Sequence, residues 1–237
     1  MILNSLIIPC YNEEKNLYKS YSKLLKIPSK IKGELILVNN GSLDGTKKIL
    51  KNLSEKNPRI KIINIKKNIG YGHGILTGLK ASRGKFVGWT HADGQTDHFE
   101  AIKGFAFIEN EKDPNKVLIM GKRSSRKFSE KIFELLMSLF ETILFKTNMN
   151  DITAQPKIMS KDFFISWKNP PVDFSLDLYA YAVAKKRNLS IKKYKINYQK
   201  RNYGISSWND GLFSKIKLSM KTISYSIKLF KSLKNEK

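Results

Sequence analysis

The chain has 237 residues, with 44 Lys and Arg against 20 Asp and Glu, so its formal net charge is +24. This length is typical of one compact domain, and a composition that is 41% hydrophobic and 27% charged excludes a disordered or fibrous protein. No apolar run reaches the roughly 20 residues of a spanning helix, and the single cysteine, Cys10, excludes an internal disulfide or a cysteine-built zinc site. The first residues lack the basic stretch and cleavage site of a signal peptide, so we expect a cytoplasmic protein.

The basic excess indicates an anionic partner. Of the 44 basic residues, 38 are Lys and only six are Arg, and they are spread along the whole chain. Sequence-specific nucleic-acid readers rely on the bidentate contacts of Arg. The composition therefore favours anionic small ligands and a membrane surface over nucleic acid. A lysine-rich composition without any functional meaning is the alternative.

The first half of the chain alternates short apolar runs with longer polar stretches. Strands are expected at residues 6–9, 34–38, 61–65 and 85–90. Helices are expected at residues 13–25, 44–54 and 75–81. This alternation predicts an α/β fold with a parallel sheet. In such sheets a ligand binds beyond the carboxyl ends of the strands.

A polar cluster follows each of the four predicted strands, at residues 9–13, 39–45, 68–74 and 91–95. Because parallel strands end at the same edge of a sheet, we expect these clusters to meet at one rim. Asn, Asp and Gly also form ordinary turns and helix caps, which is the alternative for any single cluster. Four such clusters in register favour a binding crevice of carboxylates, amides and backbone N–H groups.

The glycine-rich turn NIGYGHGILTG does not fit a dinucleotide-binding fingerprint. The pattern G-x-G-x-x-G would place its third glycine where Ile75 stands. The turn also follows the third predicted strand, whereas the fingerprint follows the first. We therefore exclude a Rossmann dehydrogenase.

The run HADGQ offers ligands for a divalent cation. In an extended chain, residues two apart point the same way, so His91, Asp93 and Gln95 would share one side. A hard divalent ion that bridges two phosphates takes one or two carboxylates and fills its other positions with water and phosphate oxygens. An imidazole ligand suits Mn²⁺ better than Mg²⁺. We expect a cation held by these three residues, with Asp93 as the main ligand.

The second half carries two apolar helices and one strand. A helix at residues 129–146 is apolar on more than one face, so it is either deeply buried or partly lipid-facing. A strand is expected at 190–198. A helix at 213–233 has one apolar face with lysines largely off it, and it either lies in a membrane interface or packs on the domain.

The motifs SLIIPCYNEEKNL, ELILVNNGSLDGT and NIGYGHGILTGLKASRGKFVGWTHADGQTD resemble the nucleotide half of family 2 glycosyltransferases with the GT-A fold. The runs DITAQPKIMSKDFF and INYQKRNYGISSW are more loosely similar to the polyprenyl-phosphate (dolichyl-phosphate) hexosyltransferase branch. The resemblance implies a mostly parallel, Rossmann-like sheet flanked by helices. It also implies hexose transfer, with inversion, from a nucleoside diphosphate sugar to a polyprenyl phosphate or saccharide acceptor, assisted by Mn²⁺ or Mg²⁺, in cell-envelope glycan or glycolipid synthesis.

The single domain divides near residue 125, and the resemblance implies a set of donor-site residues. Residues 1–125 would hold the nucleotide sugar, 126–205 the acceptor, and 206–237 would form a basic amphipathic helix, whose composition predicts that it works at the inner face of the membrane. The nucleotide-sugar residues would be Pro9, Tyr11, Asn12, Glu13, Asn40, Ser42, Asp44, Gly70, His91, Ala92 and Asp93.

The same resemblance supplies the candidate catalytic residues, which are Asp93, Asp177 and Arg201. Arg201, with Gly204 and Ser206 behind it, would hold phosphate. If the acceptor is a hydroxyl, a carboxylate must take its proton, and Asp177 is the first candidate and Asp151 the second. Either carboxylate could instead be a structural cap or ion-pair partner. A polyprenyl phosphate acceptor needs no general base.

The sequence departs from the family pattern at several charged positions. Asn39, Asn40 and His91 stand where the family usually has carboxylates, and residues 155–157 replace its S-G-F-[KR] run. These changes leave a second interpretation open, in which the chain binds a sugar nucleotide but turns it over weakly. An anionic-surface or nucleic-acid binder is the third, less favoured interpretation.

Overall fold

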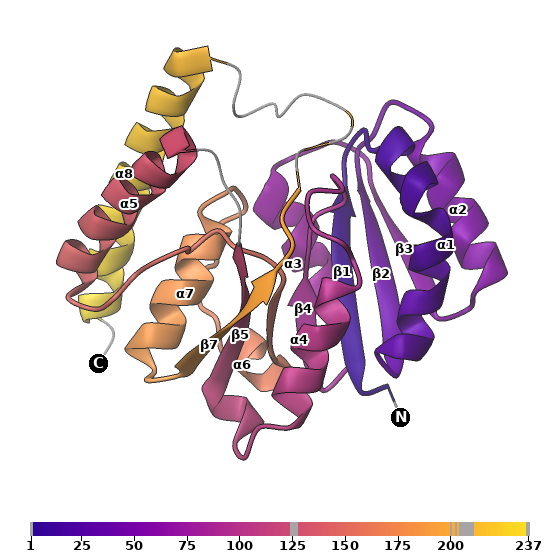
Figure 1. Cartoon of the computed structure of the whole chain (residues 1–237), viewed down its shortest axis with the longest axis horizontal. Helices are drawn as coiled ribbons and strands as arrows, with labels where there is room; N and C mark the ends of the chain where they lie inside the picture. Colours follow the sequence, from indigo (N-terminus) through magenta and orange to yellow (C-terminus); the bar gives the residue numbers. More distant parts are fainter. Residues whose placement is uncertain (1, 124–127, 200, 202, 204–210, 236–237) are drawn as a thin grey trace.

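A seven-stranded sheet forms the centre of the computed structural model, which describes residues 2–123, 128–199, 201, 203 and 211–235 (Figure 1). The strand order is β3-β2-β1-β4-β6-β5-β7. The strands are β1 (Asn4–Cys10), β2 (Gly33–Asn40), β3 (Ile60–Ile65), β4 (Phe86–Trp89), β5 (Val117–Arg123), β6 (Lys157–Ser160) and β7 (Ser190–Ile196). Only β6 runs against its neighbours, so the expected mostly parallel sheet is confirmed.

Helices cover both faces of this sheet. The helices are α1 (Glu14–Lys30), α2 (Thr46–Lys56), α3 (Tyr71–Ala81), α4 (Glu100–Glu109), α5 (Phe128–Phe145), α6 (Lys161–Ile165), α7 (Leu176–Lys186) and α8 (Gly211–Asn235), with a 3₁₀ turn at Pro114–Lys116. Because successive strand residues point to opposite faces, Leu6 and Ile8 pack with α1, α2 and α4. Ile7 packs on the other face with α3 and α7.

The four strands predicted in the first half are confirmed, but α3 begins at Tyr71, four residues before the predicted start. Gly72, Gly74 and Gly78 therefore lie inside the helix, and Gly70 directly precedes it. A Cβ on Gly78 would lie 2.5 Å from the Ile7 side chain and 3.1 Å from Val38. The absence of a side chain at this position thus lets α3 pack tightly against β1 and β2.

The two helices expected in the second half pack against each other in parallel. The Phe145 and Phe230 rings meet edge to face, 5.9 Å apart. One turn earlier, the Ser226 hydroxyl lies 2.5 Å from the Glu141 carboxyl. Leu229 and Leu233 of α8 join the core, so packing on the domain is confirmed for the described part of this helix. Among the residues with assigned positions, no helix is long and apolar enough to cross a membrane.

Glu141 makes the α5–α8 contact sensitive to pH. Its side chain is 1% exposed, and burial raises the pKa of its carboxyl from 4.5 to about 7. Ser226 Oγ also lies 2.8 Å from the Thr222 carbonyl. The Ser226 hydroxyl has one proton, so a protonated Glu141 that donates to Ser226 satisfies both contacts.

We expect Glu141→Gln to remove a loss of stability that the wild type shows as the pH rises from acidic to neutral. The folded state favours the protonated acid, so the wild type loses stability as pH rises from about 4.5 to about 7. This loss is on the order of 3 kcal/mol. Urea unfolding at pH 5 and pH 8 should show a much larger loss of stability between the two pH values in the wild type than in the variant. The same pH dependence in both proteins would contradict this assignment.

Candidate functional site

The loops after β1 and β2 are hydrogen-bonded together at the carboxyl edge of the sheet. The backbone N–H of Asn12 donates to Ser42 Oγ at 3.1 Å, and the Leu43 N–H donates to Asn12 Oδ1 at 2.8 Å. Asp44 accepts from the N–H groups of Glu14 and Thr46 at 3.1 and 3.0 Å. The first two polar clusters therefore meet at one rim, as expected. Asn12, Ser42 and Asp44 hold this rim in shape.

The two asparagines at the end of β2 play different roles. Asn39 links strands and loop, because its amide donates to Asn64 Oδ1 and its Oδ1 accepts from the Ser42 N–H. Asn40 is 3% exposed and donates to the Asn68 side chain and the Gly70 carbonyl at 3.2 and 3.1 Å. Its Oδ1 has no hydrogen-bond partner among the residues that the structure describes. That acceptor is therefore buried and unsatisfied among the described residues.

The third cluster is held against the segment before α7. The His73 N–H donates to the Val172 carbonyl at 2.8 Å. Gly70 has a φ of +151°, and a Cβ there would lie 2.5 Å from the same carbonyl. Glycine is therefore required at this point. The Tyr71 ring that follows stacks on Phe174 at 4.7 Å and lies 5.6 Å from the His91 ring.

The fourth cluster is a tight turn, so the expected extended geometry is wrong. Strand β4 ends at Trp89, Gly94 has a φ of +72°, and Asp93 Oδ1 accepts from the Gln95 N–H at 3.0 Å. This side-chain turn is typical of Asp followed by glycine. The alternation argument for His91, Asp93 and Gln95 therefore does not hold. The turn bond uses Asp93 Oδ1 and not Oδ2.

Arg201 reaches the fourth cluster from the far end of the chain. The Gln199 N–H donates to the Gln95 carbonyl at 2.8 Å, and Thr96 bridges to Tyr198. Arg201 then lies 3.0 Å from Glu13 Oε1 and 3.7 Å from Asp93 Oδ2. The sequence placed these three residues in the site but did not foresee that they pair with one another. Gly204 and Ser206 lie outside the described residues.

Burial shifts the titration of two groups around this cluster. Burial raises the pKa of Glu13, against the lowering effects of Asn16 and Arg201. Burial lowers the pKa of His91, although the nearby Asp93 and Asp177 carboxylates oppose this. The imidazole is therefore neutral at neutral pH, as a metal-binding imidazole must be.

The residues present fit a cation that arrives with phosphates. No group of three or more His, Cys, Asp or Glu that could hold a metal occurs within the described ranges. A phosphate-bridging ion, however, needs only one or two protein carboxylates. Asp93 Oδ2 already faces a positive charge, the guanidinium of Arg201 at 3.7 Å. His91 comes from the same turn and lies near enough to Asp93 for that carboxylate to raise its pKa, so these two residues would be the ones to hold such an ion.

A buried ion pair lies behind the third and fourth clusters. Lys157 is fully buried, and its ammonium lies 2.5 Å from Asp177 Oδ1 and donates to the Ala154 carbonyl at 3.1 Å. The Tyr71 hydroxyl lies 3.3 Å from Asp177 Oδ2 and also meets the Gln155 amide. Burial raises the pKa of Tyr71, and Asp177 raises it further. Burial lowers the pKa of Lys157, against the attraction of Asp177.

Both carboxylates named as candidate bases have cationic partners. Asp177 is 3% exposed and paired with Lys157. The Asp151 carboxylate accepts from the Arg123 guanidinium at 2.6 Å and from the Arg123 backbone N–H at 3.2 Å. An ion-pair role was one alternative for each carboxylate, but the sequence alone does not identify Lys157 and Arg123 as the partners. Their role as bases stays a prediction.

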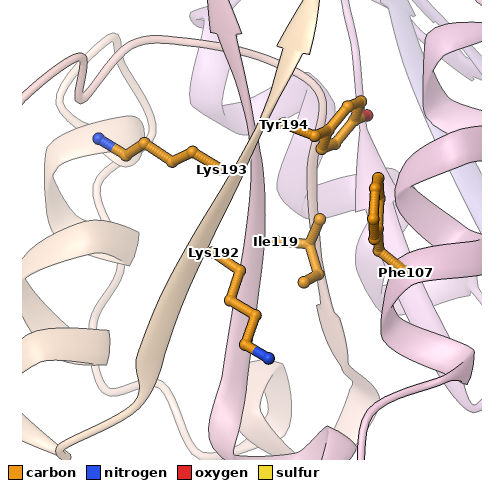
Figure 2. A pocket seen from close by; sticks show the side chains of 5 residues that line it. All are labelled: Phe107, Ile119, Lys192, Lys193 and Tyr194. Carbon is orange, nitrogen blue, oxygen red and sulfur yellow. The ribbon is translucent and has the colours of Figure 1, made fainter.

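A small pocket of about 300 Å³ lies away from these residues (Figure 2). Ile119 of β5, Phe107 of α4 and Tyr194 of β7 line it, together with Lys192 and Lys193. The Phe107 and Tyr194 rings are 5.3 Å apart. This pocket contains none of the residues expected to bind a ligand.

Solved glycosyltransferase structures share the fold of this chain. Glucosyl-3-phosphoglycerate synthase from Mycobacterium tuberculosis, crystallised with Mn²⁺, UDP-glucose and phosphoglyceric acid, superposes with a TM-score of 0.73, covering 97% of this chain and 80% of that one at 13% identity. The same synthase with UDP gives a TM-score of 0.72. This likeness confirms the expected GT-A fold.

Sequence relatives point to the same family. A dolichyl-phosphate beta-glucosyltransferase, ALG5D, from Trichomonas vaginalis is 26% identical over 91% of this chain and 68% of its own length. Another from that organism, ALG5A, is 32% identical over 52% of this chain, which spans only 41% of that relative. An uncharacterized glycosyltransferase from Synechocystis is 29% identical over 93% of this chain. The profile of "Glycosyl transferase family 2" matches residues 5–165, more than half of the chain, and the chain belongs to this family of glycosyltransferases.

Proposed function

We propose that this glycosyltransferase moves a hexose, with inversion, from a nucleoside diphosphate sugar to a polyprenyl phosphate or a small anionic or saccharide acceptor. The observation that carries the proposal is the trio of Glu13, Asp93 and Arg201 at the carboxyl edge. Carboxylate and guanidinium groups together suit a cation and a diphosphate. The activities named for the relatives and the UDP-glucose complex of the structural neighbour support the same donor class.

We assign the donor to the first half of the chain. Residues 1–125 would hold the nucleotide sugar, 126–205 the acceptor, and 206–237 would contribute the C-terminal helix. The donor contacts would come from Pro9, Tyr11, Asn12, Glu13, Asn40, Ser42, Asp44, Gly70, His91, Ala92 and Asp93. Asp93, His91 and Gln95 would hold Mn²⁺ or Mg²⁺, whose charge offsets the negative charge that develops on the diphosphate leaving group.

A phosphate acceptor agrees best with the surroundings of Asp177. A polyprenyl phosphate is already an anion, so the transfer needs no general base. Asp177 is buried and paired with Lys157, so it has a structural role that does not require it to accept a proton. An acceptor of this kind lies at a membrane surface. We therefore propose a peripheral enzyme at the inner face of the membrane, in cell-envelope glycan or glycolipid synthesis.

A transfer assay tests this function. Purified protein with Mn²⁺ and radiolabelled UDP-glucose or GDP-mannose would be offered a short polyprenyl phosphate, 3-phosphoglycerate or a disaccharide. We expect labelled glycolipid from the first acceptor and a product with inverted anomeric configuration. Donor binding without transfer to any acceptor would support the weakly active binding interpretation. Neither binding nor transfer would overturn the proposal.

Arg201 is expected to change partners when the donor binds. In the structure the guanidinium of Arg201 pairs with Glu13 and Asp93. It therefore occupies the position beside Asp93 that a cation would take. Arg201→Ala should therefore tighten Mn²⁺ binding to the protein alone while lowering kcat/KM about a hundredfold, because a charged contact to the diphosphate is lost. Calorimetric Mn²⁺ titration and steady-state kinetics measure the two effects. Weaker Mn²⁺ binding in the variant would contradict this exchange.

A further inference from the structure

Helix α5 presents an apolar face that nothing in the described structure covers. Leu135, Leu139 and Ile143 recur every four residues and are 67%, 55% and 69% exposed, and the adjoining Leu136 is 61% exposed. Residues four apart lie on the same side of a helix. On the opposite side, Glu141 is buried against α8. Isolated exposed apolar side chains are ordinary, but three leucines and an isoleucine on one helix face mark an interaction surface.

The neighbouring helix α8 mixes exposed apolar and basic side chains. Met220 and Ile227 are 67% and 40% exposed. They share a helix face with Lys231, because the three are spaced by seven and four residues. Lys228 and Lys234 are exposed on either side of it. A helix with this mixture of apolar and lysine side chains can lie in the interface of an anionic bilayer.

Charge decides between the two partners that an apolar surface of this kind could take. A second copy of the chain would bring the same lysines and the same net charge of +24 against each other. An anionic lipid surface offers acyl chains to Leu135, Leu139 and Ile143 and negative headgroups to the lysines. The described part of α5 has two acidic side chains, of which Glu141 is buried against α8 and Glu134 is half-buried, so the exposed lysines of α8 outnumber them.

The topology also places these helices beside the donor site. Strand β5 runs parallel to β1 and β4, so it ends at the carboxyl edge, and α5 starts a few residues later. Arg201 lies in the site, and α8 begins at Gly211. Figure 1 shows both helices starting on the side of the molecule where the parallel strands end.

We propose that the outer faces of α5 and α8, formed by Leu135, Leu136, Leu139, Ile143, Met220 and Ile227 with the flanking lysines, dock on an anionic lipid bilayer. This inference rests on the proposed function, because a polyprenyl phosphate acceptor is the reason for the enzyme to bind a membrane. The apolar side chains insert at the level of the headgroups, and neither helix spans the bilayer. A lipid-linked phosphate would then enter the site from the surface that these helices contact.

Vesicle flotation tests the docking face. Vesicles of phosphatidylcholine and phosphatidylglycerol in equal parts should carry the full chain upward at low salt, and pure phosphatidylcholine vesicles should not. The double variant Leu139→Gln/Ile143→Gln should reduce the bound fraction about tenfold. Ile165→Gln is the matched control, because Ile165 is 66% exposed on α6, and it should bind like the wild type.

Two further measurements separate this proposal from its alternatives. Light scattering should show a monomer, and a dimer that the double variant dissociates would mean that a second copy covers the face. The double variant should keep the melting-temperature shift that a nucleotide sugar causes, since its changes lie outside the donor site. Wild-type protein that transfers sugar but does not float would overturn the docking face alone. Protein that floats but neither binds nor transfers sugar would overturn only the proposed function.

Discussion

Replacing Asp93 with Asn is expected to lower kcat/KM about a thousandfold and to remove Mn²⁺-dependent donor binding. The variant is informative because the two oxygens of Asp93 do different things. Oδ1 holds the turn through the Gln95 N–H at 3.0 Å, and an asparagine oxygen can keep that bond. Oδ2 faces Arg201 at 3.7 Å and carries the charge that a cation needs. The substitution therefore removes the charge and keeps the turn.

Asp97→Asn provides the control for this substitution. Asp97 Oδ1 also caps a turn, by accepting from the Phe99 N–H at 3.0 Å, and its other oxygen pairs with the half-exposed Lys23. Because an exposed ion pair contributes little, kcat/KM should stay within about a factor of three of the wild type. Steady-state kinetics over a range of Mn²⁺ concentrations compares the two variants. Equal activity in Asp93→Asn and the wild type would contradict the assignment of Asp93.

Removing Asp177 is expected to destabilise the protein by about 3–5 kcal/mol. Lys157 is fully buried, and the Asp177 carboxylate balances its charge. The Lys157 ammonium lies 2.5 Å from Asp177 Oδ1. Asp177→Ala leaves that ammonium with the Ala154 carbonyl and without its ion-pair partner. The Tyr71 hydroxyl also loses an acceptor. Urea unfolding measures the change in the free energy of unfolding.

A double variant separates the structural role of Asp177 from a catalytic one. Lys157→Met with Asp177→Leu removes both charges and should recover most of the lost stability, because buried pairs can be replaced by apolar side chains of similar size. Unchanged stability in Asp177→Ala would contradict the ion-pair role. If the folded double variant still transfers sugar to a polyprenyl phosphate, Asp177 is not a required base. If it is stable and inactive, the carboxylate or the lysine acts in the reaction.

Strands and helices were predictable where the pattern of apolar residues was clear. The runs that became β1 and β2 are short, apolar and bounded by turn residues, so their strand character is readable. Strand β6 has four residues and carries the buried Lys157, a residue type that usually indicates exposure. Helix α7 is buried on all sides between Leu176 and Ala184, so it lacks the one-sided apolar periodicity that identifies a surface helix.

The site was predictable as a location and less so as a set of contacts. Polar residues after parallel strands must gather at one edge, and the first three clusters are tied to one another or to adjoining loops there. The pairing of Arg201 with Glu13 joins residues 188 positions apart, and no local pattern encodes it. The pairing of Lys157 with Asp177 depends on an antiparallel strand that the sequence did not reveal. The geometry of Asp93 was missed because Gly94 turns the chain where an extended one was expected.

The most direct test of the donor site is the melting temperature of the protein with a panel of UDP and GDP sugars, each with and without Mn²⁺. A ligand that binds only the folded state raises the melting temperature by mass action. We expect one nucleotide class to raise it, only in the presence of Mn²⁺, and Asp93→Asn to abolish the shift. No shift with any donor, or an equal shift in Asp93→Asn, would contradict a cation-assisted nucleotide-sugar site at the carboxyl edge of the sheet.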